Sequence, residues 1–173
     1  IGTCLVGSEM CIRDRILELQ KKKNQFKTYL IITGMHNSRK HGHTKDEIKK
    51  DRIRNCYNFN NQSKNISMDL VLANTIKGIN KFIKNYHTDL IVVHGDRVES
   101  LAGAISGCLN NIKVAHIEGG EISGTVDEIL RHSISKLSHL HFVTNKTAKN
   151  RLLQMGEIQK NIFTIGSPDI DII

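Results

Sequence analysis

Four short motifs bring together the residue types that proton transfer and phosphate binding need. They read TGMH at 33–36, HGDR at 94–97, HIEGGE at 116–121 and DEILRH at 127–132. Carboxylates and histidines can move protons, arginine can hold a phosphate, and glycine lets a backbone approach a ligand closely. The motifs therefore indicate acid–base chemistry on an anionic small molecule.

The strongest catalytic candidates are Asp96 and Glu118, because each follows an apolar run that predicts a buried strand. Arg97 comes next to Asp96 at the expected start of a helix, where backbone N–H groups and a guanidinium together favour a phosphate. Asp127 opens a later helix, and Arg131 lies one helical turn further on. We expect these side chains to converge on one edge of the fold.

Simpler structural roles compete with these assignments. An aspartate in the position of Asp96 often serves only as a helix N-cap. His116 interrupts an otherwise apolar strand, where a histidine is ordinarily a buried residue with satisfied hydrogen bonds. His139 and His141 alternate around a leucine and are interpreted as structural residues of the same kind.

Three further histidines, His36, His41 and His43, share one loop that also contains glycine. A zinc site would need a carboxylate or cysteine at suitable spacing, and we identify none there. We therefore predict no metal site and assign His36 to a loop that is either solvated or faces a ligand. The sequence has no GxGxxG motif, so we expect no dinucleotide cofactor, and no other cofactor is indicated.

Around these motifs, apolar strands alternate with amphipathic helices. This rhythm predicts an α/β fold with a Rossmann-like, doubly wound parallel sheet, whose ligands bind beyond the carboxyl ends of the strands. The predicted strands are 28–33, 52–59, 89–94, 113–117, 139–144 and 161–165. The predicted helices are 67–86, 98–109, 127–137 and 147–155, together with helical turns from Ile16 and a short helix that a Thr44/Glu47 capping box begins.

The composition narrows the range of partners. The 173 residues carry a net charge of +8, but the lysines are scattered and only 5% of residues are aromatic, too few for a base-stacking platform. The charge therefore favours an anionic small molecule over nucleic acid. The apolar runs are too short to span a membrane, so no membrane partner is expected. Four cysteines without CxxC spacing favour a reducing, cytoplasmic setting.

The first fifteen residues differ in character from the rest. Leu5 to Asp14 reads LVGSEMCIRD, which resembles the in-frame translation of a transposase sequencing adapter. We therefore interpret residues 1–15 as a sequencing artefact and set them aside from the fold prediction. The competing interpretation is a strand from Cys4 that runs into a Gly-Ser phosphate turn at Ser8.

The segment HGDRVESLAGAISGCLNNIKVAHIEGGEISGTVDEILRHSISKLSHLHFVTN resembles the central block of hydrolysing UDP-N-acetylglucosamine 2-epimerases. The resemblance extends from about Ile16 to Ile173 and includes TGMH and the closing IFTIGSPDID. It implies a glycosyltransferase-B type fold, with the active site between two Rossmann-like domains. Residues 16–166 would form an incomplete N-terminal domain and 167–173 the start of the crossover to a C-terminal domain that lies outside this chain.

The resemblance also implies a reaction. A base removes the proton at carbon 2 of the sugar as UDP departs, and water then adds to the 2-acetamidoglucal to give N-acetylmannosamine. By match to the family motifs, the catalytic carboxylates are Asp96, Glu118 and Asp127. The residues matched to substrate binding are Arg97 at the diphosphate, with His94, His116, Arg131 and His36 in less defined roles.

Several alternatives stay open at this point. The substrate could be UDP-N-acetylglucosamine or a related UDP-diacetamido sugar, and the whole enzyme is expected to be a homo-oligomer. A non-hydrolysing epimerase would release UDP-N-acetylmannosamine instead of the free sugar. A basic nucleotide-binding or RNA-binding module without chemistry is a third hypothesis, which a separate patch of basic residues would favour.

Overall fold

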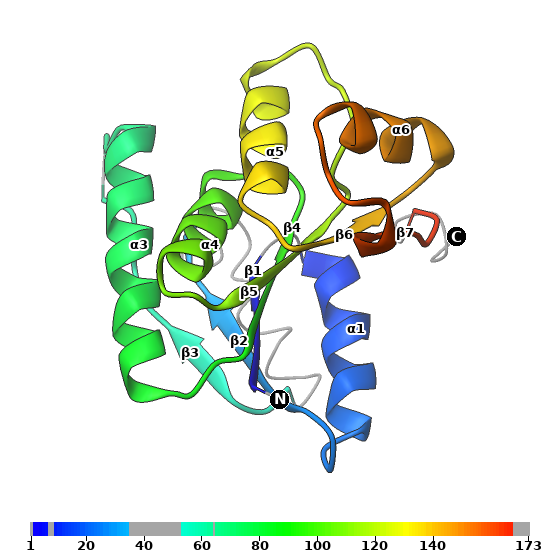
Figure 1. Cartoon of the computed structure of the whole chain (residues 1–173). Helices are drawn as coiled ribbons and strands as arrows, with labels where there is room; N and C mark the ends of the chain where they lie inside the picture. Colours follow the sequence, from blue (N-terminus) through cyan, green and yellow to red (C-terminus); the bar gives the residue numbers. More distant parts are fainter. Residues whose placement is uncertain (1, 7–8, 35–52, 64, 168–173) are drawn as a thin grey trace.

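A seven-stranded parallel sheet forms the centre of the protein (Figure 1). The computed structural model describes residues 2–6, 9–34, 53–63 and 65–167, with side chains from Arg15 onward. Every neighbouring pair of strands is parallel, in the order β3-β2-β1-β4-β5-β6-β7. The strands are β1 Gly2–Val6, β2 Lys27–Ile32, β3 Cys56–Asn58, β4 Leu90–His94, β5 Lys113–Ile117, β6 Leu140–Val143 and β7 Ile162–Thr164. This is the strand order of a doubly wound Rossmann sheet, so the predicted fold class is confirmed.

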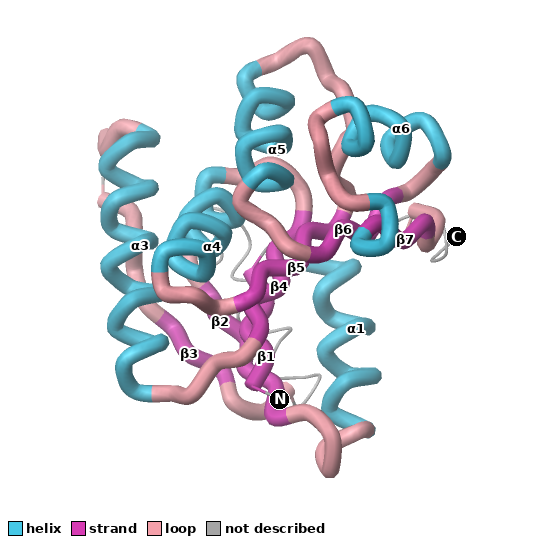
Figure 2. The backbone as a smooth tube through the Cα atoms, viewed as in Figure 1, coloured by secondary structure: helices cyan, strands magenta, loops and turns pink. Residues whose placement is uncertain are grey.

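Helices cover both faces of the sheet, as Figures 1 and 2 show. Helix α1 packs on β2 from one side, and α3 and α4 lie together on the other side, with α5 against α4 and α6 on β6 and β7. The helices are α1 Glu9–Lys21, α3 Met68–Asn85, α4 Val98–Leu109, α5 Val126–Lys136, α6 Lys146–Gln154 and the 3₁₀ turn η3 Gln159–Asn161. Among the helices the structure describes, none is both long and apolar enough to cross a bilayer.

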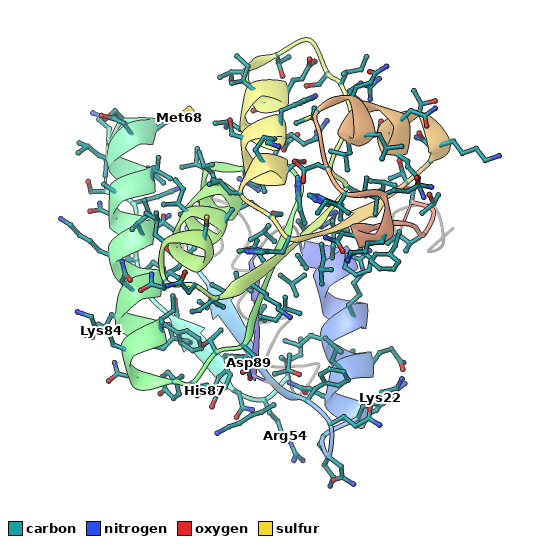
Figure 3. The ribbon with its side chains drawn as sticks, in the orientation of Figure 1. Lys22, Arg54, Met68, Lys84, His87 and Asp89 are labelled. Carbon is teal, nitrogen blue, oxygen red and sulfur yellow. The ribbon has the colours of Figure 1, made fainter. Side chains whose placement is uncertain are left out.

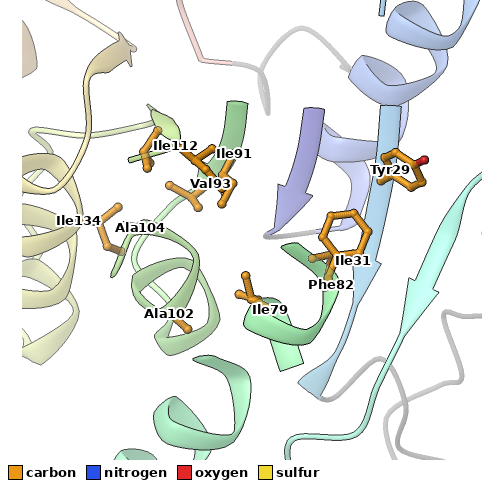
Figure 4. Close-up of a cluster of buried hydrophobic side chains, with 11 residues drawn as sticks. Tyr29, Ile31, Ile79, Phe82, Ile91, Val93, Ala102, Ala104, Ile112 and Ile134 are labelled. Carbon is orange, nitrogen blue, oxygen red and sulfur yellow. The ribbon is translucent and has the colours of Figure 1, made fainter. Parts of the chain in front are cut away.

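The main core lies between the sheet and the α3–α4 layer (Figure 4). Alternate residues of each strand point to opposite faces, so Ile31 joins this core whereas Leu30 and Ile32 pack with Ile16 on the α1 side. Phe82 of α3 is fully buried in the main core. Burial on both faces explains why the strands appear in the sequence as continuous apolar runs.

The strand order reverses between β1 and β4, which creates the switch point at which doubly wound sheets bind ligands. The loops after β4 and β5 therefore begin at this edge, and they carry the HGDR and HIEGGE motifs. His87 and Asp89 precede β4 and therefore lie at the opposite, amino-terminal end of the strands (Figure 3). The fold thus assigns the candidate chemistry to one end of the sheet.

Most predicted elements are confirmed, with ends that differ by one or two residues because end residues lack complete hydrogen-bond ladders. The strand predicted over 52–59 is the clearest difference, since only Cys56–Asn58 pairs with β2. The capping box at Thr44 lies outside the described residues. Gly156 follows α6 with a φ of +86°, the left-handed conformation in which many helices end.

The segment that the sequence analysis set aside contains residues that the structure describes as a strand. Residues 2–6 form β1, which pairs with β2 on one side and β4 on the other. The competing interpretation of a strand from Cys4 therefore agrees with the structure as far as Val6. A parallel sheet with a gap at this position would leave the edges of β2 and β4 unpaired, so any apolar segment that reaches the gap gains backbone hydrogen bonds there. The adapter origin of the segment stays a prediction.

Candidate active site

Asp96 and Arg131 form an ion pair that connects β4 to α5. The guanidinium of Arg131 donates a hydrogen bond to the Asp96 carboxylate, and both side chains are largely buried. Asp96 therefore does not act as the N-cap of α4, because that position belongs to Arg97. Removal of either partner would leave an uncompensated charge in a partly buried site.

Glu118 and His94 form a second pair at the ends of neighbouring strands. Glu118 Oε2 lies 2.9 Å from His94 Nε2, close enough for an ion pair although the two groups are not aligned as a hydrogen bond. His94 is 4% exposed, and its Nδ1 has no hydrogen-bond partner among the described residues. His94 is opposite Ile117 in the register of β4 and β5, which brings the Asp96 loop next to Glu118. A carboxylate beside a buried imidazole is a common arrangement for proton transfer.

His116 is fully buried and holds the β4 loop in place. Its Nε2 lies 2.8 Å from the Gly95 carbonyl oxygen, and its Nδ1 lies 3.0 Å from the Ser135 hydroxyl. Burial lowers the pKa of His116 to about 3, so the ring is neutral near pH 7. A neutral ring with its proton on Nε2 donates to Gly95 and accepts from Ser135. His116 is therefore a buried histidine whose hydrogen bonds position the loop carrying Asp96.

Arg97 is the N-cap residue of α4, and its side chain is 43% exposed. Its Nε lies 4.0 Å from Glu99 Oε2, which leaves the guanidinium available to a ligand. The Arg97 side chain makes no capping hydrogen bond to the first turn of α4. Ser100 anchors this turn through a 2.7 Å hydrogen bond to the His94 carbonyl oxygen.

Asp127 lies in the first turn of α5, four residues before Arg131 and therefore on the same side of the helix. It is exposed, and its described contacts are with the N-cap residue Thr125. Glu128 closes the preceding loop by accepting hydrogen bonds from the backbone N–H groups of Ser123 and Gly124. These bonds hold the pKa of Glu128 below its usual range. The structure thus orients the end of α5 but shows no contact of Asp127 with Asp96 or Glu118.

The TGMH motif is described only as far as Gly34, so His36, like His41 and His43, lies outside the described residues. Gly34 N–H donates to Asn61 Oδ1 at 2.9 Å, and Asn61 Nδ2 donates to Thr75 at 2.7 Å. Asn61 Nδ2 also lies 3.5 Å from Glu99 Oε1. Buried Asn61 therefore connects the end of β2 to α3 and to the first turn of α4, a role that its asparagine-rich surroundings did not indicate.

Two other positions that the motif analysis left without a role also bear on the site. Glu121 closes the HIEGGE motif and binds the end of β6, and Arg151 of α6 contacts Gly120.

The alternation of His139 and His141 correctly indicated structural roles: His139 Nδ1 accepts from Val114 N–H, and His141 pairs with Glu157 at 3.1 Å. Within the described residues, no three His, Cys, Asp or Glu side chains gather as a metal site would require.

The site residues lie in a segment that matches a known protein family. The family model described as UDP-N-acetylglucosamine 2-epimerase matches residues 18–173. The chain belongs to this family. The chain is 49% identical over 145 residues to a UDP-N-acetylglucosamine 2-epimerase of Neisseria meningitidis serogroup B, a match that covers 84% of this chain and 38% of that protein. It is 40% identical over 146 residues to a UDP-N,N'-diacetylbacillosamine 2-epimerase (hydrolyzing) of Legionella pneumophila, with 82% and 38% covered.

Solved epimerase structures share the fold. The UDP-GlcNAc 2-epimerase of Neisseria meningitidis bound to UDP-GlcNAc aligns with a TM-score of 0.87 at 24% identity, over 99% of this chain and 48% of that chain. The Methanocaldococcus jannaschii UDP-GlcNAc 2-epimerase in complex with UDP-GlcNAc and UDP aligns with a TM-score of 0.83 at 27% identity, over 96% and 46%. The chain thus spans about two fifths of these curated relatives and about half of these solved epimerases.

Proposed function

We propose that this chain carries the catalytic carboxylates of a hydrolysing UDP-N-acetylglucosamine 2-epimerase, acting on UDP-N-acetylglucosamine or a related UDP-diacetamido sugar. The observation that carries the proposal is the pair of contacts Glu118–His94 and Asp96–Arg131 at the ends of β4 and β5. They set two carboxylates, each with a nitrogen partner, beside the switch point of the sheet. Family membership supplies the substrate class.

The proposed reaction needs a base, a stabilised leaving group and a source of water. One carboxylate of the set Asp96, Glu118 and Asp127 removes the proton at carbon 2, and the electron pair expels UDP from carbon 1. Water then adds to the 2-acetamidoglucal, which yields the free N-acetylmannosamine-type sugar. Arg97 and the first turn of α4 hold the departing diphosphate, because a cation and open N–H groups stabilise the charge that develops there.

The hydrolysing outcome is the finer part of the proposal. It is supported by relatives from Legionella pneumophila and Campylobacter jejuni whose names specify hydrolyzing epimerases, at 40% and 37% identity. The Neisseria relative carries the plain epimerase name, which keeps the non-hydrolysing reaction as the second candidate. A non-catalytic RNA-binding module is disfavoured, because such a module has no need of the carboxylates Asp96 and Glu118 in contact with Arg131 and His94.

Because the chain spans only part of its relatives, we propose that it works as part of a longer enzyme. We further propose that this enzyme is cytoplasmic and homo-oligomeric. The test uses the full-length protein encoded by the same DNA, incubated with UDP-N-acetylglucosamine and followed by NMR of the products. Free N-acetylmannosamine with UDP is the expected result. UDP-N-acetylmannosamine would establish the non-hydrolysing reaction instead, and an unchanged substrate would refute both. A UDP-diacetamido sugar in a parallel reaction identifies the preferred substrate.

A further inference from the structure

The turn that carries Glu118 is held from outside by α6 and the end of β6. The guanidinium of Arg151 donates a hydrogen bond to the Gly120 carbonyl oxygen across 31 residues of sequence. The Glu121 carboxylate accepts one hydrogen bond from the Thr144 hydroxyl and a second, of 2.9 Å, from the Asn145 amide. Asn145 is itself the N-cap residue of α6, so the turn and the helix share one polar junction.

The same turn is confined on two sides by close packing. A Cβ on Gly120, whose φ is +79°, would lie 2.5 Å from the Ala148 carbonyl oxygen of α6. A Cβ on Gly119 would lie 2.8 Å from the Ser135 hydroxyl of α5 and 2.9 Å from His116. Only glycine fits at either position, and the backbone therefore has little freedom between the two helices.

Glu118 has a conformation that needs such support. Its φ of +64° is in the left-handed region, which costs a residue with a Cβ about 1 kcal/mol relative to a right-handed conformation. Its N–H donates to the Phe142 carbonyl oxygen at 2.8 Å. Because the residue is a glutamate and not a glycine, the left-handed conformation strains the backbone here. Strain of this kind persists only where surrounding contacts fix the backbone, and it is found preferentially at active sites.

We propose that Arg151 and Glu121 are positioning residues that keep the Glu118 carboxylate against His94. The inference rests on the proposed function for its kinetic consequences, but the Glu118–His94 contact can be observed without turnover. The planar guanidinium of Arg151, on α6, binds the carbonyl oxygen of Gly120. The carboxylate of Glu121 binds the Asn145 amide, which follows β6. Loss of either anchor lets the strained turn relax and moves the carboxylate away from the imidazole.

The first measurement observes the contact directly in this chain. Two-dimensional NMR of the imidazole nitrogens compares wild type with Arg151→Met and Glu121→Met, which keep side-chain length but remove the groups that make the anchoring hydrogen bonds. The His94 ring signals are expected to shift, whereas those of His87, at the far end of the sheet (Figure 3), stay in place. Lys146→Gln is the matched control, because it removes one positive charge from the exposed face of the same helix.

The second measurement follows turnover in the full-length protein. Arg151→Met and Glu121→Met should lower kcat for UDP release by about 100-fold while KM changes little, since a misplaced group of this kind affects the reacting geometry. Arg151→Lys keeps the positive charge and should recover part of kcat. It also replaces Arg151→Met in the test if that variant does not fold. Lys146→Gln should keep wild-type kinetics.

The outcomes separate the two proposals. His94 signals that are the same in wild type and both anchor variants, or a kcat that stays at the wild-type value in them, would overturn the positioning role. A wild-type protein that releases no UDP, but whose His94 signals respond to Arg151→Met, would refute the proposed function and retain the positioning role.

Discussion

Arg131 contacts the carboxylate of Asp96 across 35 residues of sequence, and through this contact α5 is joined to the end of β4. The pair is largely buried, so neither charge is well solvated when its partner is lost. It gives the loop after β4 a fixed position beside Glu118, and the predictions below start from that geometry.

Asp96→Asn and Glu118→Gln should each lower the rate of UDP release from UDP-N-acetylglucosamine by at least about 100-fold in the full-length protein. The amides keep the shape of the carboxylates but cannot take up the proton. UDP binding, measured by calorimetry, should stay within about threefold of wild type. Asp89→Asn, at the opposite edge of the sheet, is the control. Full activity in a double Asp96→Asn, Glu118→Gln variant would refute the assignment.

Arg97→Ala should instead weaken binding. Loss of an exposed guanidinium from a diphosphate site is expected to raise the Kd for UDP by about tenfold, which corresponds to ~1.4 kcal/mol. The effect should diminish at high salt, because the exposed charge is screened. Lys84→Ala, in the exposed last turn of α3 at the other end of the molecule (Figure 3), provides the comparison for the loss of a remote positive charge. A Kd for UDP that does not change in Arg97→Ala would contradict the diphosphate role.

The chain itself should show no measurable UDP release, whereas the full-length protein should. A reacting sugar must be positioned and shielded from water, and the comparison with relatives twice as long indicates that this chain supplies one part of such an enclosure. Both proteins are assayed side by side at equal molar concentration. Equal rates would show that the described domain is sufficient for the reaction.

Stability should fall as the pH is lowered below about 6.5. His116 has a pKa of about 3 in the folded chain against 6.5 in the unfolded chain, so between these values the unfolded state binds more protons. The contribution of His116 is complete above pH 6.5 and decreases by up to ~1.4 kcal/mol per pH unit as the pH falls toward 3. Burial also lowers the pKa of His141, which acts in the same direction.

Urea unfolding of this chain at several pH values between 7 and 4 measures this dependence. His116→Gln should be less stable at pH 7, because the contacts with Gly95 and Ser135 change, but should lose stability less steeply as the pH falls. His87→Gln, exposed at the other end of the sheet, should keep the wild-type slope. Equal slopes for wild type and His116→Gln would show that His116 is not held neutral.

Gly120→Ala should destabilise the chain more than Gly156→Ala, although both glycines have a positive φ. At Gly156 nothing lies within 4 Å of an added Cβ, so only the left-handed conformation costs free energy, about 1 kcal/mol. At Gly120 the Cβ also meets a backbone carbonyl, which should add about 2 kcal/mol. Thermal unfolding of both variants separates the two contributions, and equal melting temperatures would contradict the close packing of the turn on α6.

The local sequence was sufficient for the elements and for the edge on which the chemistry lies. Continuous apolar runs require strands that are buried on both faces, and their alternation with helices allows few topologies besides a doubly wound parallel sheet. Asp96 and Glu118 could be placed at the same edge because parallel strands end together. The motifs also carried the resemblance to the epimerase family, which the family model over residues 18–173 confirms.

Contacts between distant residues could not be predicted in this way. The pairing of Asp96 with Arg131, the neutral state of His116 and the contact of Arg151 with Gly120 depend on which helix packs next to which strand end. The same limit applied to residues 2–6, where the sequence left two interpretations open and only the pairing of β1 with β2 and β4 decided for the strand. Sequence periodicity determines which face of an element is buried. The hydrogen-bond partners of a polar side chain, and the extent of its desolvation, are determined only when the elements pack.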